Sequence, residues 1–341
     1  MMRPVCAAAC GGAVAIAAAP AHAAAWPPMS YLQTFGAAGD PVTRLGWGLG
    51  IVSIVVTVIV VVLVAWGAWR RRPVPTDPRA LTVRSDSGGM PWVYIGVGVS
   101  TLVLIVCATW TMFTIAAVAM PAHAADTTVQ VTASQWWWAA RYASPDAARI
   151  FTTANEIHIP VGRAVRVELA SIDVIHSFWI PQLAGKMDVI PGQTNVMWLQ
   201  ADRPGVYRGQ CGEYCGAQHA HMAMSVIADA PDAYRAWADA QLREAAAPAS
   251  APAQHGRDAF VANCGACHTV RGAGAGGILG PDLTHLMSRQ TIAAGLLPNT
   301  PGNLAAWIAD SQALKPGSRM PRLALSGPDL ASIVAYLETL K

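Results

Sequence analysis

The sequence predicts a multidomain chain with a two-helix transmembrane hairpin, an all-β sandwich or barrel, and a small all-α domain. Three observations support this division. Two long apolar runs lie in the first 120 residues, short β-type runs fill residues 127–229, and helical patterns dominate residues 255–341. The composition agrees with a membrane anchor, because only 13% of the 341 residues are charged and the mean hydropathy is +0.35.

The two apolar runs, residues 47–69 and 90–120, contain no charged side chain. Each is longer than the roughly 20 residues that a helix needs to cross a bilayer, so we expect membrane helices at 47–69 and 92–119. The loop between them, residues 70–91, carries five arginines against two aspartates. The positive-inside rule therefore places this loop in the cytoplasm and everything after residue 120 outside it.

The N-terminus, residues 1–24, has one arginine, a short apolar stretch and an Ala21-His22-Ala23 site. This pattern is typical of a cleaved signal peptide, with cleavage after Ala23 or nearby, which leaves residues 25–125 as an N-terminal segment and the helical hairpin. A lipid-anchored Cys6 or Cys10 is the lesser alternative, because too little apolar sequence precedes either cysteine. The net charge of +3 gives no sign of a nucleic-acid partner.

Residues 126–230 consist of short alternating or β-branched runs separated by turn-forming stretches. Many short strands at this spacing favour an all-β sandwich or barrel. Residues 231–247 then change to a helical pattern that opens with proline. Residues 245–254, AAAPASAPAQ, have no side chain to bury and predict a semi-rigid linker, so we assign 231–254 to a helix and linker.

The final segment, residues 255–341, contains the motif Cys264-Gly265-Ala266-Cys267-His268, which is the c-type haem attachment pattern. Its two thiols can form thioethers to haem, and His268 can bind the iron. A thioredoxin-like redox pair is the weaker alternative, because a small helical domain surrounds the motif. Met320 is our candidate for the sixth ligand, since a thioether suits electron transfer.

Met287 and His285 are the rivals of Met320 for the sixth iron ligand. The segment resembles a class I cytochrome c, a family in which the distal methionine comes late, in a loop before the last helix. The resemblance implies an all-α cytochrome c domain with covalent haem c. It favours Met320, which has that place in the sequence.

Residues 209–222, GQCGEYCGAQHAHM, combine thiols, imidazoles and a thioether, which are ligands that select copper, zinc or iron. A closed zinc site from Cys211, Cys215, His219 and perhaps His221 is one interpretation. Met222 favours copper instead, because thioethers are poor zinc ligands, and His176 lies upstream as a further imidazole. Two thiolates can bridge two copper ions, so the ligand count permits a dinuclear centre.

The pattern Cys-x-Glu-x-Cys-x3-His-x2-Met, with an upstream Asp-Val-x-His-Ser and two membrane helices, closely resembles subunit II of haem-copper cytochrome c oxidases over roughly residues 30–230. The resemblance implies a cupredoxin-like fold and a dinuclear copper A centre. Its ligands would be His176, Cys211, the carbonyl of Glu213, Cys215, His219 and Met222. The Glu213 carboxylate would also reach a magnesium ion shared with subunit I, whereas His221 is not a ligand in this family.

The same resemblance extends to several residues around the copper ligands. Trp136, the first tryptophan of Gln-Trp-Trp-Trp at 135–138, corresponds to the point at which electrons enter, although three aromatic residues on a strand more often serve packing. Asp173 and Asp188 match positions near the subunit I interface or docking surface, or are simply solvated acids. His158 is expected to be a strand residue without a metal role.

One departure concerns the start of the second membrane helix. Family members commonly carry a glutamate there that assists proton uptake, whereas Asp86 is the only acid nearby in this chain. The resemblance therefore does not extend to that role.

These features imply the electron-input subunit of a respiratory haem-copper terminal oxidase in the bacterial inner membrane. Electrons from an external donor, such as cytochrome c or a quinol-oxidising complex, would pass through haem c and copper A to subunit I, which reduces oxygen to water. The chain has no recognisable oxygen-reducing site, so the proton-translocating oxidoreductase activity belongs to the complex with subunit I, the other oxidase subunits and membrane lipid.

Two alternative functions remain open. A copper A subunit of a nitric oxide reductase would have nearly the same sequence, because the acceptor gas binds elsewhere. A membrane-tethered copper-binding or copper-delivery protein is disfavoured by the haem motif, since a copper carrier needs no electron relay beside its metal.

Overall fold

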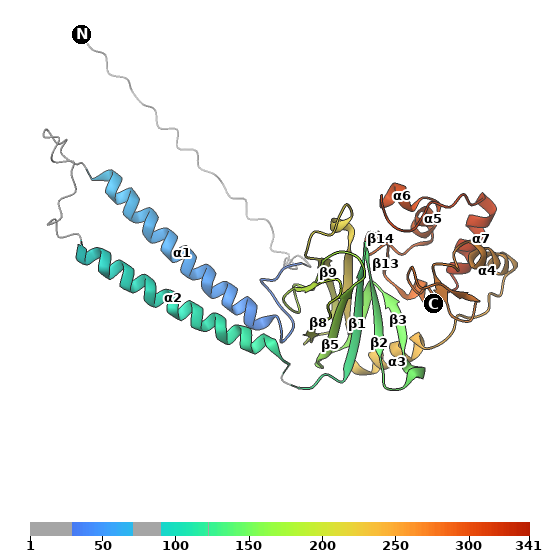
Figure 1. The fold of residues 1–341 in the computed structure, drawn as a ribbon, viewed down its shortest axis with the longest axis horizontal. Coiled ribbons are helices and arrows are strands. Elements are labelled where there is room, and N and C mark those ends of the chain that lie inside the picture. Colours follow the sequence, from blue (N-terminus) through green and yellow to red (C-terminus); the bar gives the residue numbers. More distant parts are fainter. Residues whose placement is uncertain (1–28, 71–89, 122) are drawn as a thin grey trace, which may run out of the picture.

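A computed structural model describes residues 29–70, 90–121 and 123–341. The expected signal peptide, most of the arginine-rich loop and Asp86 lie outside these ranges. Along the chain, a pair of long helices is followed by a β sandwich and then by a small helical domain (Figure 1). This order agrees with the fold class that the sequence predicts.

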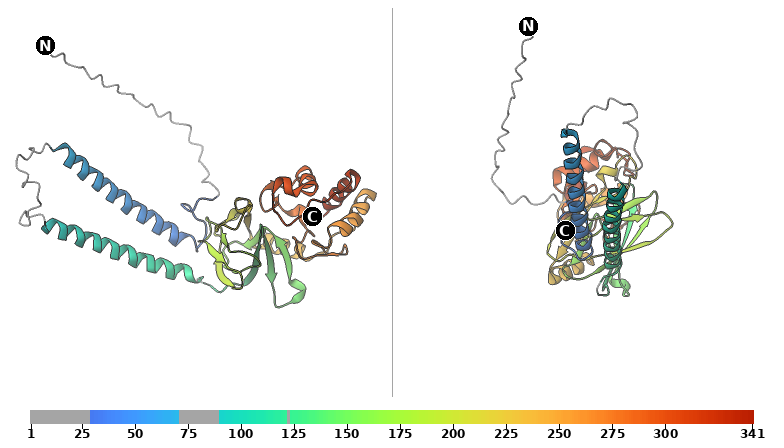
Figure 2. Two further views of the ribbon diagram at one scale, coloured as in Figure 1. Left: turned by 45° about the horizontal axis from the view of Figure 1, so that its top comes forward. Right: turned by 90° about the vertical axis from the view of Figure 1, so that its left-hand side faces the viewer.

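The two long helices are α1 (Asp40–Trp69) and α2 (Met90–Ala119), each of 30 residues. At 1.5 Å per residue each is about 45 Å long, enough to cross a hydrocarbon core of about 30 Å. Both qualify as candidate membrane spans, and their apolar side chains are exposed almost throughout. They lie beside each other in both views of Figure 2.

The start of α1 differs from the expected position at residue 47. The helix begins at Asp40, because an acid and Pro41 occupy its first turn, where both are favourable. Near this end the two helices touch, since a Cβ on Gly48 would lie 2.3 Å from the ring of Trp110.

The β sandwich has two five-stranded sheets within the described residues. The first has the order β3 (Phe151–Ala154), β2 (Trp137–Ala143), β1 (Thr127–Ser134), β5 (Val165–Ser171) and β8 (Asn195–Leu199). The second has the order β4 (Glu156–Pro160), β10 (Ala223–Asp229), β9 (Gly205–Cys211), β6 (His176–Trp179) and β7 (Met187–Val189). Within the sheets β1 pairs with β5 and β10 with β4 in parallel, and the other pairs are antiparallel.

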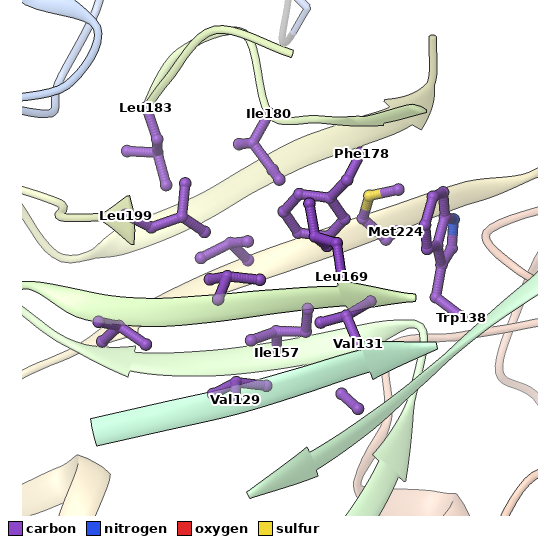
Figure 3. Packing of buried hydrophobic residues seen from close by; sticks show 14 of the residues in the cluster. Val129, Val131, Trp138, Ile157, Leu169, Phe178, Ile180, Leu183, Leu199 and Met224 are labelled. Carbon is purple, nitrogen blue, oxygen red and sulfur yellow. The ribbon is translucent and has the colours of Figure 1, made fainter. Parts of the chain in front are cut away.

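The core of the sandwich lies between the two sheets, where alternate side chains of each strand meet. Figure 3 shows Val129, Val131 and Leu169 of the first sheet packed with Ile157 and Phe178 of the second. Trp138 extends this core toward one end of the sandwich. Its ring meets Phe178 edge-on at a centroid distance of 5.5 Å and lies 6.0 Å from the ring of His176.

Helix α3 (Pro231–Gln241) packs on the sandwich and leads into the helical domain. This domain contains α4 (Ala251–Asn263), α5 (Pro301–Ala309), α6 (Ser311–Leu314) and α7 (Gly327–Leu337), with the short hairpins β11 (Thr269–Val270) to β12 (Ala275–Gly276) and β13 (Thr291–Ile292) to β14 (Leu297–Pro298). In Figure 1 the β13–β14 hairpin lies at the junction with the sandwich.

The predicted linker at 245–254 is wrong at its C-terminal end, because α4 already begins at Ala251. Ser250 caps this helix by accepting a hydrogen bond from the Ala253 N–H, and Pro252 lies in its first turn. A proline that suggests an extended linker in the sequence therefore starts a helix in the structure.

Candidate metal centre and haem attachment site

One end of the sandwich brings together all six residues predicted to hold copper. His176 begins β6 and Cys211 ends β9. Phe178 lies opposite Cys211 in the register of these two strands, so His176 lies two residues beyond that pair, near the Cys211 thiol. The other four residues lie in the turn between β9 and β10, which contains the 3-10 helix η3 (His219–His221): Glu213, Cys215, His219 and Met222.

The two thiols occupy the centre of this cluster, with a Cys211 Sγ to Cys215 Sγ distance of 3.8 Å. A disulfide would require about 2.05 Å, so both cysteines are free. Cys211 Sγ lies 3.9 Å from His176 Nδ1 and 3.3 Å from the Glu213 carbonyl oxygen. Cys215 Sγ lies 3.6 Å from His219 Nδ1 and 3.9 Å from Met222 Sδ. Each thiol is thus flanked by one imidazole and one weaker donor.

The surroundings of the two thiols separate their affinities for protons. The side-chain contacts with Cys215 and His176 lower the pKa of Cys211 to about 3, against the effect of burial. The contact with Cys211, together with burial, raises the pKa of Cys215. Cys211 therefore gives up its proton more readily than Cys215 does. Thiolate ligands must be deprotonated, so metal binding here would be coupled to proton release.

Asp173 orients His176 within the cluster. Its Oδ1 lies 2.8 Å from His176 Nε2, which leaves Nδ1 directed at the thiols. Burial acts to raise the pKa of Asp173, but hydrogen bonds from His176 and from the backbone of Gln135 and Val174 lower it below its usual value. A carboxylate on the outer nitrogen of a ligand histidine fixes the tautomer and the ring orientation, as metal sites require.

Trp136 contacts the cluster directly and is only 8% exposed. Its Nε1 donates a hydrogen bond of 3.0 Å to the carbonyl of Cys215, and Gln135 Nε2 donates to the same oxygen at 2.8 Å. Gly216 follows with a positive φ of 114°, and a Cβ there would lie 3.1 Å from the indole ring. The backbone of one candidate ligand is therefore bonded to the predicted electron-accepting tryptophan.

The haem attachment motif begins where α4 ends, with Cys264 as the C-cap residue. The backbone N–H groups of Cys267 and His268 both donate to the Cys264 carbonyl at 3.0 Å, which folds the motif into a single turn. His268 Nδ1 lies 2.9 Å from the Pro281 carbonyl. The Nδ1 proton is thereby engaged, which leaves Nε2 available for iron.

A loop that contains Gly277 and Gly280 packs closely against this turn, as a loop that helps to hold a haem would. A Cβ on Gly280 would lie 2.6 Å from His268 Cε1, and one on Gly277 would lie 2.4 Å from Ala266. Only glycine allows the loop to approach the attachment residues this closely.

Met320 lies in the loop between α6 and α7, where its carbonyl accepts hydrogen bonds from Ser311 Oγ at 2.8 Å and Gln312 Nε2 at 2.7 Å. The rivals are otherwise engaged. Met287 packs against the core of the helical domain, and both ring nitrogens of His285 lie within hydrogen-bond distance of backbone carbonyls, at 2.8 and 3.1 Å. Met320 thus remains our candidate for the sixth ligand.

The other residues considered from the sequence lie outside the sulfur cluster. His221 Nδ1 is 2.6 Å from Gln218 Oε1, and His158 stacks on Trp237 with its Nδ1 2.6 Å from Asp229. Asp188 lies 3.4 Å from Lys186, which is also 3.8 Å from the Glu213 carboxylate.

Sequence reasoning missed the contacts that two residues make near the cluster. Asp173 supports a ligand from three residues away, which its position in the loop before His176 could have suggested. Lys315 reaches the same region from the helical domain, and nothing in the sequence indicates this contact.

Comparison with known proteins covers both domains. Residues 143–229 match the family described as cytochrome c oxidase subunit II, periplasmic domain, and residues 253–341 match the cytochrome c family. Cytochrome c oxidase subunit 2 of Alkalihalophilus pseudofirmus is 38% identical over 297 residues, which cover 86% of this chain and 84% of that protein. The alternative cytochrome c oxidase subunit 2 of Bradyrhizobium diazoefficiens is 27% identical, over 63% of this chain and 83% of its own length.

Among solved structures, the periplasmic domain of subunit II of cytochrome oxidase of Bradyrhizobium japonicum is 31% identical. The matched region covers 36% of this chain and 96% of that domain, with a TM-score of 0.33.

Proposed function

Because the chain belongs to the cytochrome c oxidase subunit II family, we propose that it is the electron-input subunit of a respiratory terminal oxidase and carries its own fused haem c. In this proposal electrons from an external donor reach subunit I through haem c and copper A, and subunit I reduces oxygen to water. The relative from Alkalihalophilus pseudofirmus is a cytochrome c oxidase subunit 2, so the oxidoreductase activity would be that of the whole complex.

The observation that carries the proposal is the pair of free thiols 3.8 Å apart, each beside one imidazole and one weaker donor. Two copper ions held by this set would supply a centre that gains and loses one electron with little rearrangement. A closed zinc site needs only four ligands. It would not use the Met222 sulfur or the Glu213 carbonyl as a ligand. The buried position of Cys211, Cys215 and Met222 keeps water away from the metal.

Trp136 suits the proposed role at the point where electrons arrive at copper. Its indole is hydrogen-bonded to the Cys215 carbonyl on one side. On the other side lies the helical domain, since a Cβ on Gly317 would come within 3.5 Å of the indole ring. The tryptophan therefore lies between the copper ligand loop and the loop that carries Met320.

The two apolar helices support a membrane anchor, and the arginine-rich loop supports an orientation with both metal domains on the periplasmic face of the bacterial inner membrane. Subunit I would then contact the copper end of the sandwich. The Glu213 side chain is 46% exposed and could contribute to a magnesium site shared with subunit I, as the family resemblance implies.

Electron paramagnetic resonance of the copper-loaded chain tests the site. One unpaired electron shared equally by two coppers is expected, and a mononuclear signal or bound zinc would contradict the proposal. Reconstitution with subunit I tests the reaction, because oxygen consumption in excess of nitric oxide consumption is expected from an oxidase. The reverse preference would assign the chain to a nitric oxide reductase.

A further inference from the structure

Lys315 lies at the junction between the haem domain and the copper domain, just after α6. It is one of three lysines in the sequence, with Lys186 and Lys341, and it is only 3% exposed. A lysine that is buried this deeply requires partners for its ammonium group. Its contacts therefore indicate how the two domains are held together.

The ammonium of Lys315 has three N–H donors, and the structure provides three backbone carbonyls for them. Nζ donates to the Trp136 carbonyl at 2.8 Å, to the His221 carbonyl at 2.7 Å and to the Ala293 carbonyl at 3.0 Å. Two of these acceptors belong to the copper domain and one to the haem domain. A single side chain thus ties the two domains together with all its donors used.

The two acceptors in the copper domain adjoin the proposed copper centre. His221 immediately precedes Met222 and closes the 3-10 helix that carries His219. Trp136 donates its indole N–H to the carbonyl of Cys215. Lys315 therefore contacts the copper domain at the backbone of the ligand turn and at the backbone of the tryptophan beside it.

On its own side, Lys315 is linked rigidly to the loop that carries Met320. The Lys315 N–H donates to the Ser311 carbonyl at 2.8 Å, and Ser311 Oγ donates to the Met320 carbonyl at the same distance. Gln312 Nε2 bridges the carbonyls of Ser318 and Met320. The Lys315 backbone and the Met320 loop therefore belong to one hydrogen-bonded unit of the haem domain.

The Ala293 carbonyl is presented to Lys315 by an unusual backbone. Ala293 and Ala294 have positive φ values of 55° and 61°, which non-glycine residues rarely adopt. The carbonyls of both face the junction, since Ala294 accepts a hydrogen bond of 3.0 Å from the Ala223 N–H of the copper domain. Such conformations persist only where the surroundings enforce them.

We propose that Lys315 is a positioning residue that holds the haem domain on the copper domain in the arrangement used for electron transfer between them. This inference rests on the proposed function. Other polar contacts also cross the junction, including the buried Glu156 carboxylate, which accepts hydrogen bonds from the backbone of Gln290 and Thr291. Arg319 contacts Asp173 with a side chain that is 59% exposed, and Gln218 makes a single neutral bond to the Pro316 carbonyl.

The substitution Lys315→Met in the full chain, assembled with subunit I, tests the proposal against Lys341→Met, which removes an exposed lysine at the C-terminus. Hydrogen exchange at the junction amides of Ala223, Gln290 and Thr291 is the first measurement. We expect Lys315→Met to lower their protection at least tenfold while the optical and paramagnetic spectra of haem and copper stay unchanged. Unchanged protection, or loss of the copper signal, would overturn the positioning role.

Electron transfer from photoreduced haem to copper is the second measurement. A held haem domain predicts a wild-type rate that does not change with added glycerol, and a Lys315→Met rate that is at least tenfold lower and falls with viscosity. A viscosity-dependent wild-type rate would contradict the inference even if the variant did not assemble. Absence of any haem-to-copper transfer in the wild type would instead contradict the proposed function.

Discussion

Asp173 Oδ2 lies 3.3 Å from Arg319 Nη2, so the acid that orients a proposed copper ligand also contacts the residue next to the proposed iron ligand. Its other carboxylate oxygen lies 2.8 Å from His176 Nε2. These two contacts differ in strength. The pair with the exposed arginine contributes about 0–1 kcal/mol, whereas the buried contact with His176 controls the geometry of the metal site.

Substitution of Asp173 by asparagine is expected to weaken copper binding by roughly 10- to 100-fold, because His176 loses the carboxylate that fixes its tautomer. A competitive copper titration of the full chain would measure the change. Asp188→Asn is the matched control, since the Asp188 carboxylate contacts only Lys186 among the described residues and should leave the affinity unchanged. Equal affinities for the Asp173→Asn variant and the wild type would show that Asp173 does not support the site.

Substitution of Met320 by leucine is expected to remove the sixth iron ligand while haem attachment at Cys264 and Cys267 persists. Because a thioether favours the reduced ion, the reduction potential of the haem should fall, and the ferric spectrum should lose its methionine-to-iron band. Met287→Leu is the control, because Met287 packs against the domain core and leucine has a similar volume. If Met287→Leu lost the band and Met320→Leu kept it, the ligand assignment would be reversed.

The protonation of Glu156, a residue at the domain junction, should make the stability of the folded chain depend on pH. Its carboxylate is 3% exposed and accepts hydrogen bonds from the backbone of Gln290 at 2.7 Å and Thr291 at 3.1 Å. Burial raises the pKa of Glu156, although these hydrogen bonds and Arg289 oppose the shift. The folded state therefore binds the proton more tightly than the unfolded state does. This contribution to stability is complete below the unfolded value of 4.5 and is lost as pH rises through the folded pKa.

Glu156→Gln retains an oxygen acceptor for both amides but does not ionise. Its free energy of unfolding should match the wild type below pH 4.5 and exceed it once the pH is above the folded pKa, by about 1.4 kcal/mol for each unit by which that pKa is raised, with a correspondingly higher melting temperature. The haem Soret band would monitor both proteins. A constant difference between them across the pH range would rule out titration of Glu156 as the cause.

The fold and the two proposed sites were largely predictable because their signals are local in sequence. Apolar runs mark α1 and α2, and the ligands from Cys211 to Met222 lie in a single turn between two strands. The short strands β6 and β7 were harder to predict, because the pairing of β6 with β9 and of β7 with β6 decides their conformation more than their own composition does. The pairing of β6 with β9 is also what places His176 beside Cys211.

The contacts between the domains could not be predicted, since they depend on residues far apart in the sequence. Lys315 lies next to a proline in a polar loop and resembles a solvated lysine until the fold places three carbonyls around it. The sequence likewise suggests that Glu156 is an exposed strand residue, whereas in the structure its carboxylate is buried and bonded to the backbone of Gln290 and Thr291, where the β13–β14 hairpin begins. Neither a sequence periodicity nor a short motif indicates which residues of the two domains will contact each other.

The packing of α4 against α7 gives a final prediction, about the stability of the haem domain. A Cβ on Gly256 would lie 1.8 Å from the Ser332 carbonyl oxygen, so Gly256→Ala must push the two helices apart. Overpacking of this kind costs about 1–3 kcal/mol, which outweighs the roughly 0.5–1 kcal/mol that alanine normally gains over glycine in a helix. Thermal unfolding followed at the haem Soret band should show a lower midpoint. Gly302→Ala in α5 is the control, because a Cβ there meets no atom within 4 Å and should leave the midpoint equal or higher.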